Sequence, residues 1–271
     1  MLNDLTELAR VAGRIALAHA GVERDVHRKG RGDWVSHVDR LIEETLTSRI
    51  RARHPDHQIL GEEGGGTPEA HRHLWIIDPI DGTTNYLRGI PAWAVSIAVC
   101  EPRAGGFVPR YGIVFDPTRD EAFTAEAGAG AWCNGKRIYT TPCEQIGDAL
   151  LASALPFRFP EHLPTCGAVH LDLARRCEDH RRGGAASLDL AYVAAGRLDG
   201  YYELAIWPWD TAAGELLVRC AGGKATDYLG REDGLTTRRS IVAAATPALH
   251  GDLLAAVQPL AAAAQALPGP T

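Results

Sequence analysis

The sequence places acidic residues where apolar segments end. Asp78 and Asp81 follow the run Trp75-Ile76-Ile77 and lie in the segment Asp78-Pro79-Ile80-Asp81-Gly82, whose proline fixes φ and whose glycine permits a tight turn. The amides that follow can form a helix N-terminus, which binds phosphate through free N–H groups and the helix dipole. Carboxylates beside an anion site would repel the anion unless a cation lay between them, and hard oxygen ligands suit Mg²⁺. The segment therefore indicates metal-assisted phosphate chemistry.

Each acidic motif also has a purely structural interpretation. An isolated Asp-Pro-x-Asp-Gly segment is equally typical of a turn. Glu62-Glu63 is compatible with a solvated loop, Asp210 with a helix N-cap, and Asp39 with a helix first turn that favours negative charge. No single motif decides between the two interpretations, but together they supply enough carboxylates for a two-metal phosphate site.

Two amphipathic helices are predicted before these motifs. Apolar residues at three-and-four spacing predict a helix over 2–20, and Ser36 is placed to cap a second helix that ends near Arg53, before Pro55. Residues 25–36 are rich in Gly, Arg, Lys and Asp and are expected to form a loop.

Strands dominate the middle of the chain, and helices alternate with strands after Pro142. Asn134-Gly135 predicts a hairpin turn. We therefore expect an α/β (α+β) fold whose half 1–145 carries most of the acids and whose half 146–271 carries Asp210, packed as one compact unit. The predicted strands are 92–100, 107–115, 121–125, 149–154, 199–204 and 240–245, and the later predicted helices are 167–179, 187–196, 210–221 and 247–258.

These motifs resemble those of the inositol monophosphatase family of Mg²⁺-dependent, lithium-sensitive phosphatases. The resemblance runs from about residue 2 to residue 260. It implies a layered αβαβα sandwich of the inositol monophosphatase and fructose bisphosphatase type, a homodimer, and hydrolysis of a phosphate monoester by metal-activated water. The matching segments occur in the family's order and are KGRGDWVSHVD, GEE, WIIDPIDGTTNY and WDTAAGELLV.

The resemblance also implies roles for individual residues. Two or three Mg²⁺ ions would be held by the side chains of Glu62, Asp78, Asp81 and Asp210 and by the Ile80 carbonyl. Glu62 and Thr83 would hold the attacking water, and Asp39 would orient Thr83. Contacts to the substrate would come from Lys29, Gly82, Thr83, Gly184, Ala185, Ala186, Glu203 and Asp210.

Glu203 would bind a hydroxyl of the leaving alcohol, for which myo-inositol monophosphate is the first expectation. The chain departs from the family at Ala185, where Ser or Thr is frequent, and beside Lys29, where Arg28 and Arg31 are close in sequence. These departures leave the identity of the alcohol open. Histidinol-phosphate phosphatase and fructose bisphosphatase are alternatives on the same fold, and a non-catalytic regulator that binds a protein partner is an alternative of another class.

Charge and cysteine usage suggest the compartment and the partners. The net charge is −6, from 28 basic and 34 acidic residues, without the basic excess of a typical duplex-binding protein. We therefore expect no nucleic-acid partner and a small phosphorylated alcohol as substrate. No apolar stretch reaches the length of about 20 residues that spans a bilayer, so we expect no membrane partner. No secretory leader pattern is present and no CxxC pair occurs, so we expect reduced thiols in the cytoplasm.

The expected site contains six acidic residues, as many as the net negative charge of the whole chain. They are Asp39, Glu62, Asp78, Asp81, Glu203 and Asp210.

Overall fold

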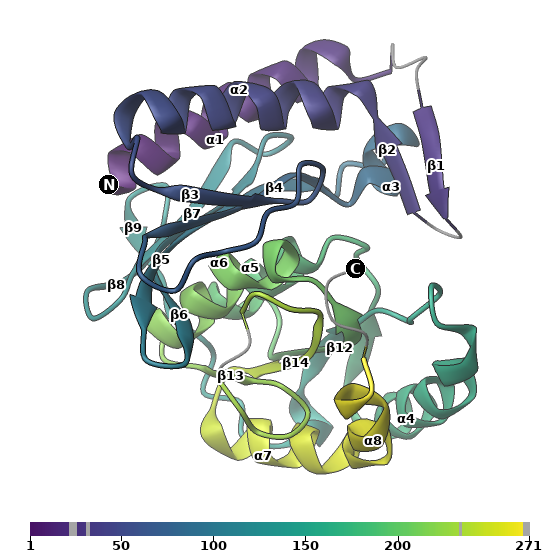
Figure 1. Cartoon of the computed structure of the whole chain (residues 1–271). Helices are drawn as coiled ribbons and strands as arrows, with labels where there is room; N and C mark the ends of the chain where they lie inside the picture. The colour runs from purple at the N-terminus through teal and green to yellow at the C-terminus, as the bar shows by residue number, and fades with distance from the viewer. Residues whose placement is uncertain (22–25, 31–32, 233–234, 268–271) are drawn as a thin grey trace.

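Helices and sheets alternate in five layers, which confirms the expected αβαβα sandwich (Figure 1). The computed structural model describes residues 1–21, 26–30, 33–232 and 235–267, and the side chains of 26–35 are not described. From one side to the other, the layers are α1 with α2, a seven-stranded sheet, α5 with α6, a five-stranded sheet, and α4 with α7 and α8.

The first helix layer covers the outer face of the seven-stranded sheet. The helices are α1 (Leu2–His19) and α2 (His37–Arg53), and their apolar stripes are buried against the sheet, as their spacing predicts. Ser36 caps α2, because its hydroxyl accepts from the backbone N–H groups of Val38 and Asp39. Within the described residues, no helix has both the length and the apolar content needed to cross a membrane.

The seven-stranded sheet carries the Asp78–Asp81 segment on its second strand. Every residue of β4 is buried, which accounts for its unbroken apolar character. Asn134 and Gly135 have φ of 48° and 78° and join β8 to β9, so the predicted hairpin turn is confirmed. The strands, in sheet order, are β3 (Gln58–Gly61), β4 (Leu74–Asp81), β5 (Ala94–Arg103), β6 (Gly106–Asp116), β7 (Glu121–Glu126), β8 (Gly130–Cys133) and β9 (Lys136–Arg137).

Helices α5 and α6 form the central layer and pack against both sheets. Their contact is close: a Cβ placed on Gly214 would lie 2.6 Å from the Cβ of Leu190. The largest buried apolar cluster contains residues of both helices and both sheets. The central layer therefore holds the two halves of the chain together. Its helices are α5 (Ala186–Ala194) and α6 (Pro208–Cys220).

The five-stranded sheet is mixed. Strand β10 pairs in parallel with β11 and β12, whereas β14 runs antiparallel to β12 and β13. In sheet order the strands are β11 (Asp179–Arg181), β10 (Leu150–Ser153), β12 (Gly200–Ile206), β14 (Arg239–Ala244) and β13 (Lys224–Thr226). The helices that pack outside it are α4 (Leu163–Arg176), α7 (Pro247–Ala256) and α8 (Ala261–Gln265).

The structure corrects one sequence prediction near the N-terminus. Residues 25–36 were expected to form a loop, but β1 (Val26–Gly30) and β2 (Asp33–Ser36) pair as an antiparallel ribbon. These strands lack the apolar alternation that marks a strand in a sequence. Helix α3 (Thr83–Leu87) begins where the sequence allowed a helix N-terminus after Gly82. The short β11, β13 and α8 were not predicted, because such short segments carry too few residues to show a pattern.

Replacing Gly214 by Ala is expected to lower the free energy of unfolding by about 1–3 kcal/mol, because the added methyl group overpacks the α5–α6 contact. Gly167 is a matched control: it lies in α4, and a Cβ there would meet nothing within 4 Å. Gly167→Ala should leave stability unchanged or raise it by up to about 1 kcal/mol, through helix propensity. Urea unfolding of both variants checks the difference, and equal effects would contradict the close packing.

Candidate active site

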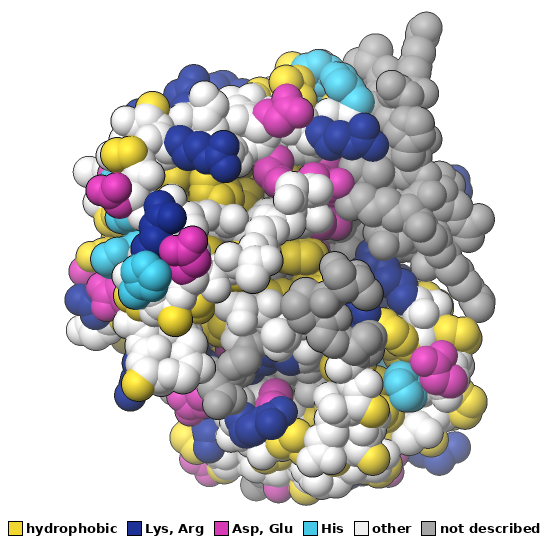
Figure 2. Space-filling model, in the orientation of Figure 1, with side chains coloured by type: hydrophobic (Ala, Val, Ile, Leu, Met, Phe, Trp, Pro, Cys, Tyr) yellow, Lys and Arg dark blue, Asp and Glu magenta, His cyan; other side chains and the backbone are white. Residues whose placement is uncertain are grey.

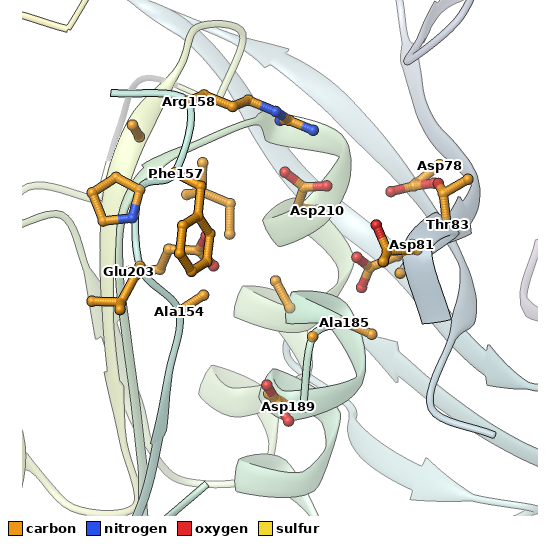
Figure 3. A pocket seen from close by; sticks show the side chains of 18 of the residues that line it. Asp78, Asp81, Thr83, Ala154, Phe157, Arg158, Ala185, Asp189, Glu203 and Asp210 are labelled. Atoms are coloured by element: carbon orange, nitrogen blue, oxygen red, sulfur yellow. The ribbon is translucent and has the colours of Figure 1, made fainter. Parts of the chain in front are cut away.

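A cavity of about 330 Å³ opens between the two halves, at the carboxyl end of β4. Residues from the end of β4, the start of α5, the start of α6 and strand β12 line it. In Figure 3, Asp78, Asp81 and Thr83 lie on one side of the cavity, Glu203 and Phe157 on the other, and Asp210 between them. The cavity therefore has one strongly acidic wall, made mostly by the first half of the chain.

Three carboxylates converge on this wall. Oxygens of Asp78, Asp81 and Asp210 all lie within 4.8 Å of one another. Asp78 is fixed by a turn in which its Oδ1 accepts the Ile80 N–H at 2.9 Å, and a bulge in the β4–β5 pairing lies between Asp78 and Asp81. Asp210 is in the first turn of α6 and accepts the Trp207 N–H at 2.9 Å. A strand end and a helix start thus bring together side chains about 130 residues apart in sequence.

Ser187 holds Asp81 in place and was not identified from the sequence as part of the site. Its backbone N–H and its hydroxyl both donate to Asp81 Oδ2, at 2.7 and 2.5 Å. One oxygen of Asp81 is therefore bound by the start of α5. The sequence signal was a serine in the first turn of a predicted helix, which by itself does not reveal a partner 106 residues away.

Gly82 lets the two halves approach closely beside these acids. Its φ is +88°, and a Cβ there would lie 3.1 Å from the Ala185 Cβ and 3.2 Å from the Gly184 carbonyl oxygen. Asn85 joins the halves again, donating to the Gly183 carbonyl at 2.9 Å. Any larger residue at position 82 would be strained and would push the acidic wall away from α5.

The acidic cluster is electrostatically unfavourable in the protein alone. Burial, followed by the charges of Glu62 and Asp81, raises the pKa of Asp78 well above its usual range. Burial, followed by the charge of Asp210, raises the pKa of Asp81, although the hydrogen bonds from Ser187 act in the opposite direction. A divalent cation among these oxygens would remove the repulsion, because it favours the ionised form of each carboxyl group.

Glu62 lies beside this cluster. It follows β3, its N–H donates to the Ile77 carbonyl at 3.3 Å, and it lines the same cavity. Its charge is the second cause of the raised pKa of Asp78, so the two side chains interact. Glu62 is not a member of the three-residue group of converging oxygens.

Thr83 and Asp39 are arranged differently from the sequence expectation. The Thr83 hydroxyl donates to the Ile80 carbonyl at 3.0 Å. Asp39 uses Oδ2 to accept from the N–H and hydroxyl of Ser36, at 2.8 and 2.6 Å, and its buried Oδ1 has no hydrogen-bond partner among the described residues. Burial raises the pKa of Asp39 to about 6. The expected Asp39–Thr83 hydrogen bond is not observed in the part of the chain that the structure describes.

Two further acids, Glu203 and Asp189, line the cavity. Burial raises the pKa of Glu203 to about 7, while the Tyr201 hydroxyl, which donates to it, acts in the opposite direction. Asp189 also lines the cavity, and burial raises its pKa to about 7 against the opposing charge of Arg182. The sequence interpretation did not include Asp189, because a lone acid in a helix first turn is usual.

Most of the residues expected from sequence to form the site do line this one cavity. The side chain of Lys29 lies outside the described part of the chain, and Asp39 is not among the lining residues. The expected residues that line it are Glu62, Asp78, Ile80, Asp81, Gly82, Thr83, Gly184, Ala185, Ala186, Glu203 and Asp210.

The residues at the acidic wall fit a magnesium site. Mg²⁺ binds oxygen ligands at about 2.0–2.1 Å, so oxygens gathered around it lie within a few ångströms of one another, as the three carboxylates do. The donor set contains only oxygen, which suits Mg²⁺ better than Zn²⁺. The unpartnered Asp39 Oδ1 is a further acceptor in the adjoining first turn of α2.

The pKa of Glu203 makes stability depend on pH. The pKa of Glu203 rises from 4.5 to about 7 on folding. The contribution of Glu203 to the free energy of unfolding is therefore fully present below pH 4.5 and is lost as pH rises through 7. Glu203→Gln removes this ionisation. Between pH 4.5 and pH 8, the free energy of unfolding of the variant should therefore rise by about 3 kcal/mol relative to that of the unmodified chain. Urea unfolding in the presence of a chelator measures this difference. A difference in unfolding free energy that does not depend on pH would contradict the raised pKa of Glu203. The unfolding free energy of Asp189→Asn should rise with pH in the same direction, relative to the unmodified chain.

Similar proteins are known by sequence and by structure. "Nus factor SuhB" of Vibrio cholerae is 43% identical over 236 residues, which are 86% of this chain and 87% of that protein. The solved structure of Thermotoga maritima IMPase has a TM-score of 0.86 at 31% identity, and the match covers 97% of this chain and 98% of that one. SaIMPase-II of Staphylococcus aureus, solved with inositol monophosphate bound, has a TM-score of 0.79 at 25% identity, over 95% of this chain and 93% of its own.

The name of the Vibrio cholerae relative overturns one expectation. The name Nus factor is not that of a phosphatase. It conflicts with the expectation that the chain has no nucleic-acid partner, and that expectation was wrong. That expectation relied on net charge, which does not report the surface. Apart from the six acids of the expected site, 28 acidic residues remain and equal the 28 Lys and Arg residues. Figure 2 shows both signs interspersed on the visible face.

The comparison with family models agrees with the fold. Residues 1–262 match the model of the inositol monophosphatase family, which is nearly the whole chain. The chain belongs to the inositol monophosphatase family.

Proposed function

We propose that the protein hydrolyses a phosphate monoester in a Mg²⁺-dependent reaction, with myo-inositol monophosphate as the first substrate to test. The observation that carries this proposal is the convergence of Asp78, Asp81 and Asp210 within 4.8 Å in a cavity large enough for a small phosphorylated alcohol. Oxygen ligands of this kind give phosphoryl transfer the charge neutralisation on which it depends. Membership of the inositol monophosphatase family supports the same reaction.

The first half of the chain would perform most of the chemistry. Glu62, Asp78, Asp81, Asp210 and the Ile80 carbonyl are the proposed ligands of two or three Mg²⁺ ions. Bound Mg²⁺ would supply positive charge that lowers the pKa of the attacking water and neutralises the leaving alkoxide.

Other groups of the chain would bind and orient the reactants. Glu62 would accept the proton of the water, and Thr83 would position that water. The backbone amides of Gly82 and Thr83 would bind phosphate oxygens. In the metal-loaded protein the Ile80 carbonyl would be a ligand, and we propose that Asp39, whose Oδ1 has no partner among the described residues, would then accept a hydrogen bond from the Thr83 hydroxyl.

The far end of the cavity would bind the alcohol. Glu203 would accept a hydrogen bond from a hydroxyl of the alcohol, and Asp189 lines the same cavity, so an alcohol with several hydrogen-bond donors suits the cavity. Gly184, Ala185 and Ala186 would line the ring of the alcohol, and Lys29 would contact the substrate from β1. The SaIMPase-II structure with inositol monophosphate bound supports testing that compound first.

Three further properties of this protein are proposed because it resembles the family. We propose lithium inhibition, a homodimer and a cytoplasmic location. The free thiols of all six cysteines support a reducing compartment.

A regulatory function is the second candidate. It is favoured by the name Nus factor SuhB, which several curated relatives of about 40% identity carry. A pure binding protein would not need two buried carboxylates and a half-buried one that repel one another, so we place hydrolysis first.

Asp210→Asn and Asp81→Asn are each expected to reduce Mg²⁺-dependent phosphate release from myo-inositol monophosphate by at least about 100-fold, because each variant removes a charge from the metal ligands. Phosphate release with and without Mg²⁺ measures this. Asp252→Asn, an exposed position on α7, is the control and should keep full activity. Near-normal turnover at saturating Mg²⁺ in either ligand variant would refute the metal assignment. No turnover of inositol or histidinol phosphate by the unmodified chain would favour the regulatory function.

Glu203→Ala is expected to change the preference among phosphorylated alcohols more than the Mg²⁺ requirement. The side chain lies at the far end of the cavity, away from the three converging carboxylates. The measurement is kcat/KM for inositol phosphate and histidinol phosphate in parallel, each with a Mg²⁺ titration. An unchanged ratio between the two substrates would show that Glu203 does not contact the alcohol.

A further inference from the structure

A buried carboxylate on α2 holds the loop that carries Glu62. Glu43 is 7% exposed and does not line the cavity. Its Oε2 accepts the Glu63 N–H at 2.9 Å, and its Oε1 accepts the Gly64 N–H at 2.6 Å. The two oxygens of one side chain thus bind two consecutive amides, directly after the proposed metal ligand. The mechanism proposed above gives this carboxylate no role.

The loop fits closely around this carboxylate. A Cβ on Gly61 would lie 2.4 Å from Glu43 Oε1, and a Cβ on Gly64 would lie 2.6 Å from the same oxygen. Gly61 and Gly65 exchange two backbone hydrogen bonds, at 3.1 and 3.2 Å, which close the loop around residues 62–64. Only residues without side chains at positions 61 and 64 leave space for the carboxylate.

Glu62 is therefore held from both sides. Its own N–H is bound to the Ile77 carbonyl of β4, one residue before Asp78, while the next two amides are bound to Glu43 on α2. Because both oxygens of Glu43 accept from backbone amides, Glu43 would support the loop of a proposed metal ligand and would not itself bind the ion.

We propose that Glu43 is a positioning residue that holds Glu62 at the acidic wall and thereby sets the affinity of the site for divalent cations. The inference rests on the proposed function, because it takes Glu62 as a metal ligand. A loop that is already ordered loses less conformational entropy when a cation binds, so its ligands bind that cation more tightly. A carboxylate that only stabilised the fold would change unfolding without changing metal affinity in the folded protein.

The test is Glu43→Gln in the full-length chain, compared with Glu44→Gln, the exposed neighbour on the same helix. Gln keeps the shape of Glu, but its amide NH₂ faces a backbone N–H and cannot accept from it. Calorimetric titration with Mn²⁺ and Mg²⁺ should show metal binding weakened roughly 10-fold or more in Glu43→Gln, the usual effect of removing a group that orients a ligand. Glu44→Gln should bind metal normally. In turnover assays, Glu43→Gln should need more Mg²⁺ while KM for substrate at saturating Mg²⁺ is unchanged.

A double variant shows whether Glu43 acts through Glu62. In a chain that already carries Glu62→Gln, adding Glu43→Gln should weaken metal binding no further. Additive losses would overturn the inference, and so would normal metal affinity in Glu43→Gln when Glu62→Gln is impaired. Normal metal affinity in Glu62→Gln would instead refute the proposed ligand role of Glu62, so the two failures are distinguishable.

A second variant keeps the inference testable if Glu43→Gln does not fold. Gly64→Ala leaves the carboxylate in place and displaces the loop, because the added methyl group would meet Glu43 Oε1. It should weaken metal binding in the same direction, while Gly167→Ala, which adds a methyl group in open space, should not. Unchanged metal affinity in a folded Gly64→Ala protein would overturn the proposal.

Discussion

The repulsion among buried carboxylates is the constraint on which this structure depends. Asp78 and Asp81 are almost fully buried, and each raises the free energy of the ionised state of the acids around it. A chain can hold such a cluster only if backbone hydrogen bonds and packing fix every member. The Asp78 turn, the Ser187 hydrogen bonds to Asp81 and the N-terminal turn of α6 provide this. A cation would turn the repulsion into attraction, which is why the cluster supports a metal-dependent function.

The five layers serve to bring these acids to one point. The β4 strand is buried on both faces and ends at the cavity, while α5 and α6 begin there. The close approach of Gly82 to Gly184 and Ala185 then joins the two halves beside the acids. Each half supplies part of the wall, so the site exists only when the sheets face each other across the central helices. Packing at a distance from the cavity therefore affects the position of these acids.

The elements that the sequence predicted well are those with strong local patterns. The α1 and α2 stripes, the Ser36 cap and the Asn134-Gly135 turn follow from periodicity, hydrogen-bonding chemistry and the conformational freedom of glycine and asparagine. The β1–β2 ribbon was predicted as a loop, because its residues are polar and its pairing lies in the backbone. The expectation of no nucleic-acid partner was wrong because a single net charge does not describe a surface.

The residue types at the site were determined by the sequence alone, as were the strand and turn that present Asp78 and Asp81. Their order along the chain identified a phosphatase family and suggested Mg²⁺. The tertiary structure decided which groups hold those residues, namely Ser187 on Asp81 and Glu43 on the loop of Glu62, and it brought Asp189 to the same cavity. It also showed Thr83 donating to Ile80 rather than to Asp39. A spacing pattern records only which residues are near in sequence, whereas the contacts of Glu43 and Ser187 join positions 20 to more than 100 residues apart and depend on burial and on the direction of each hydrogen bond.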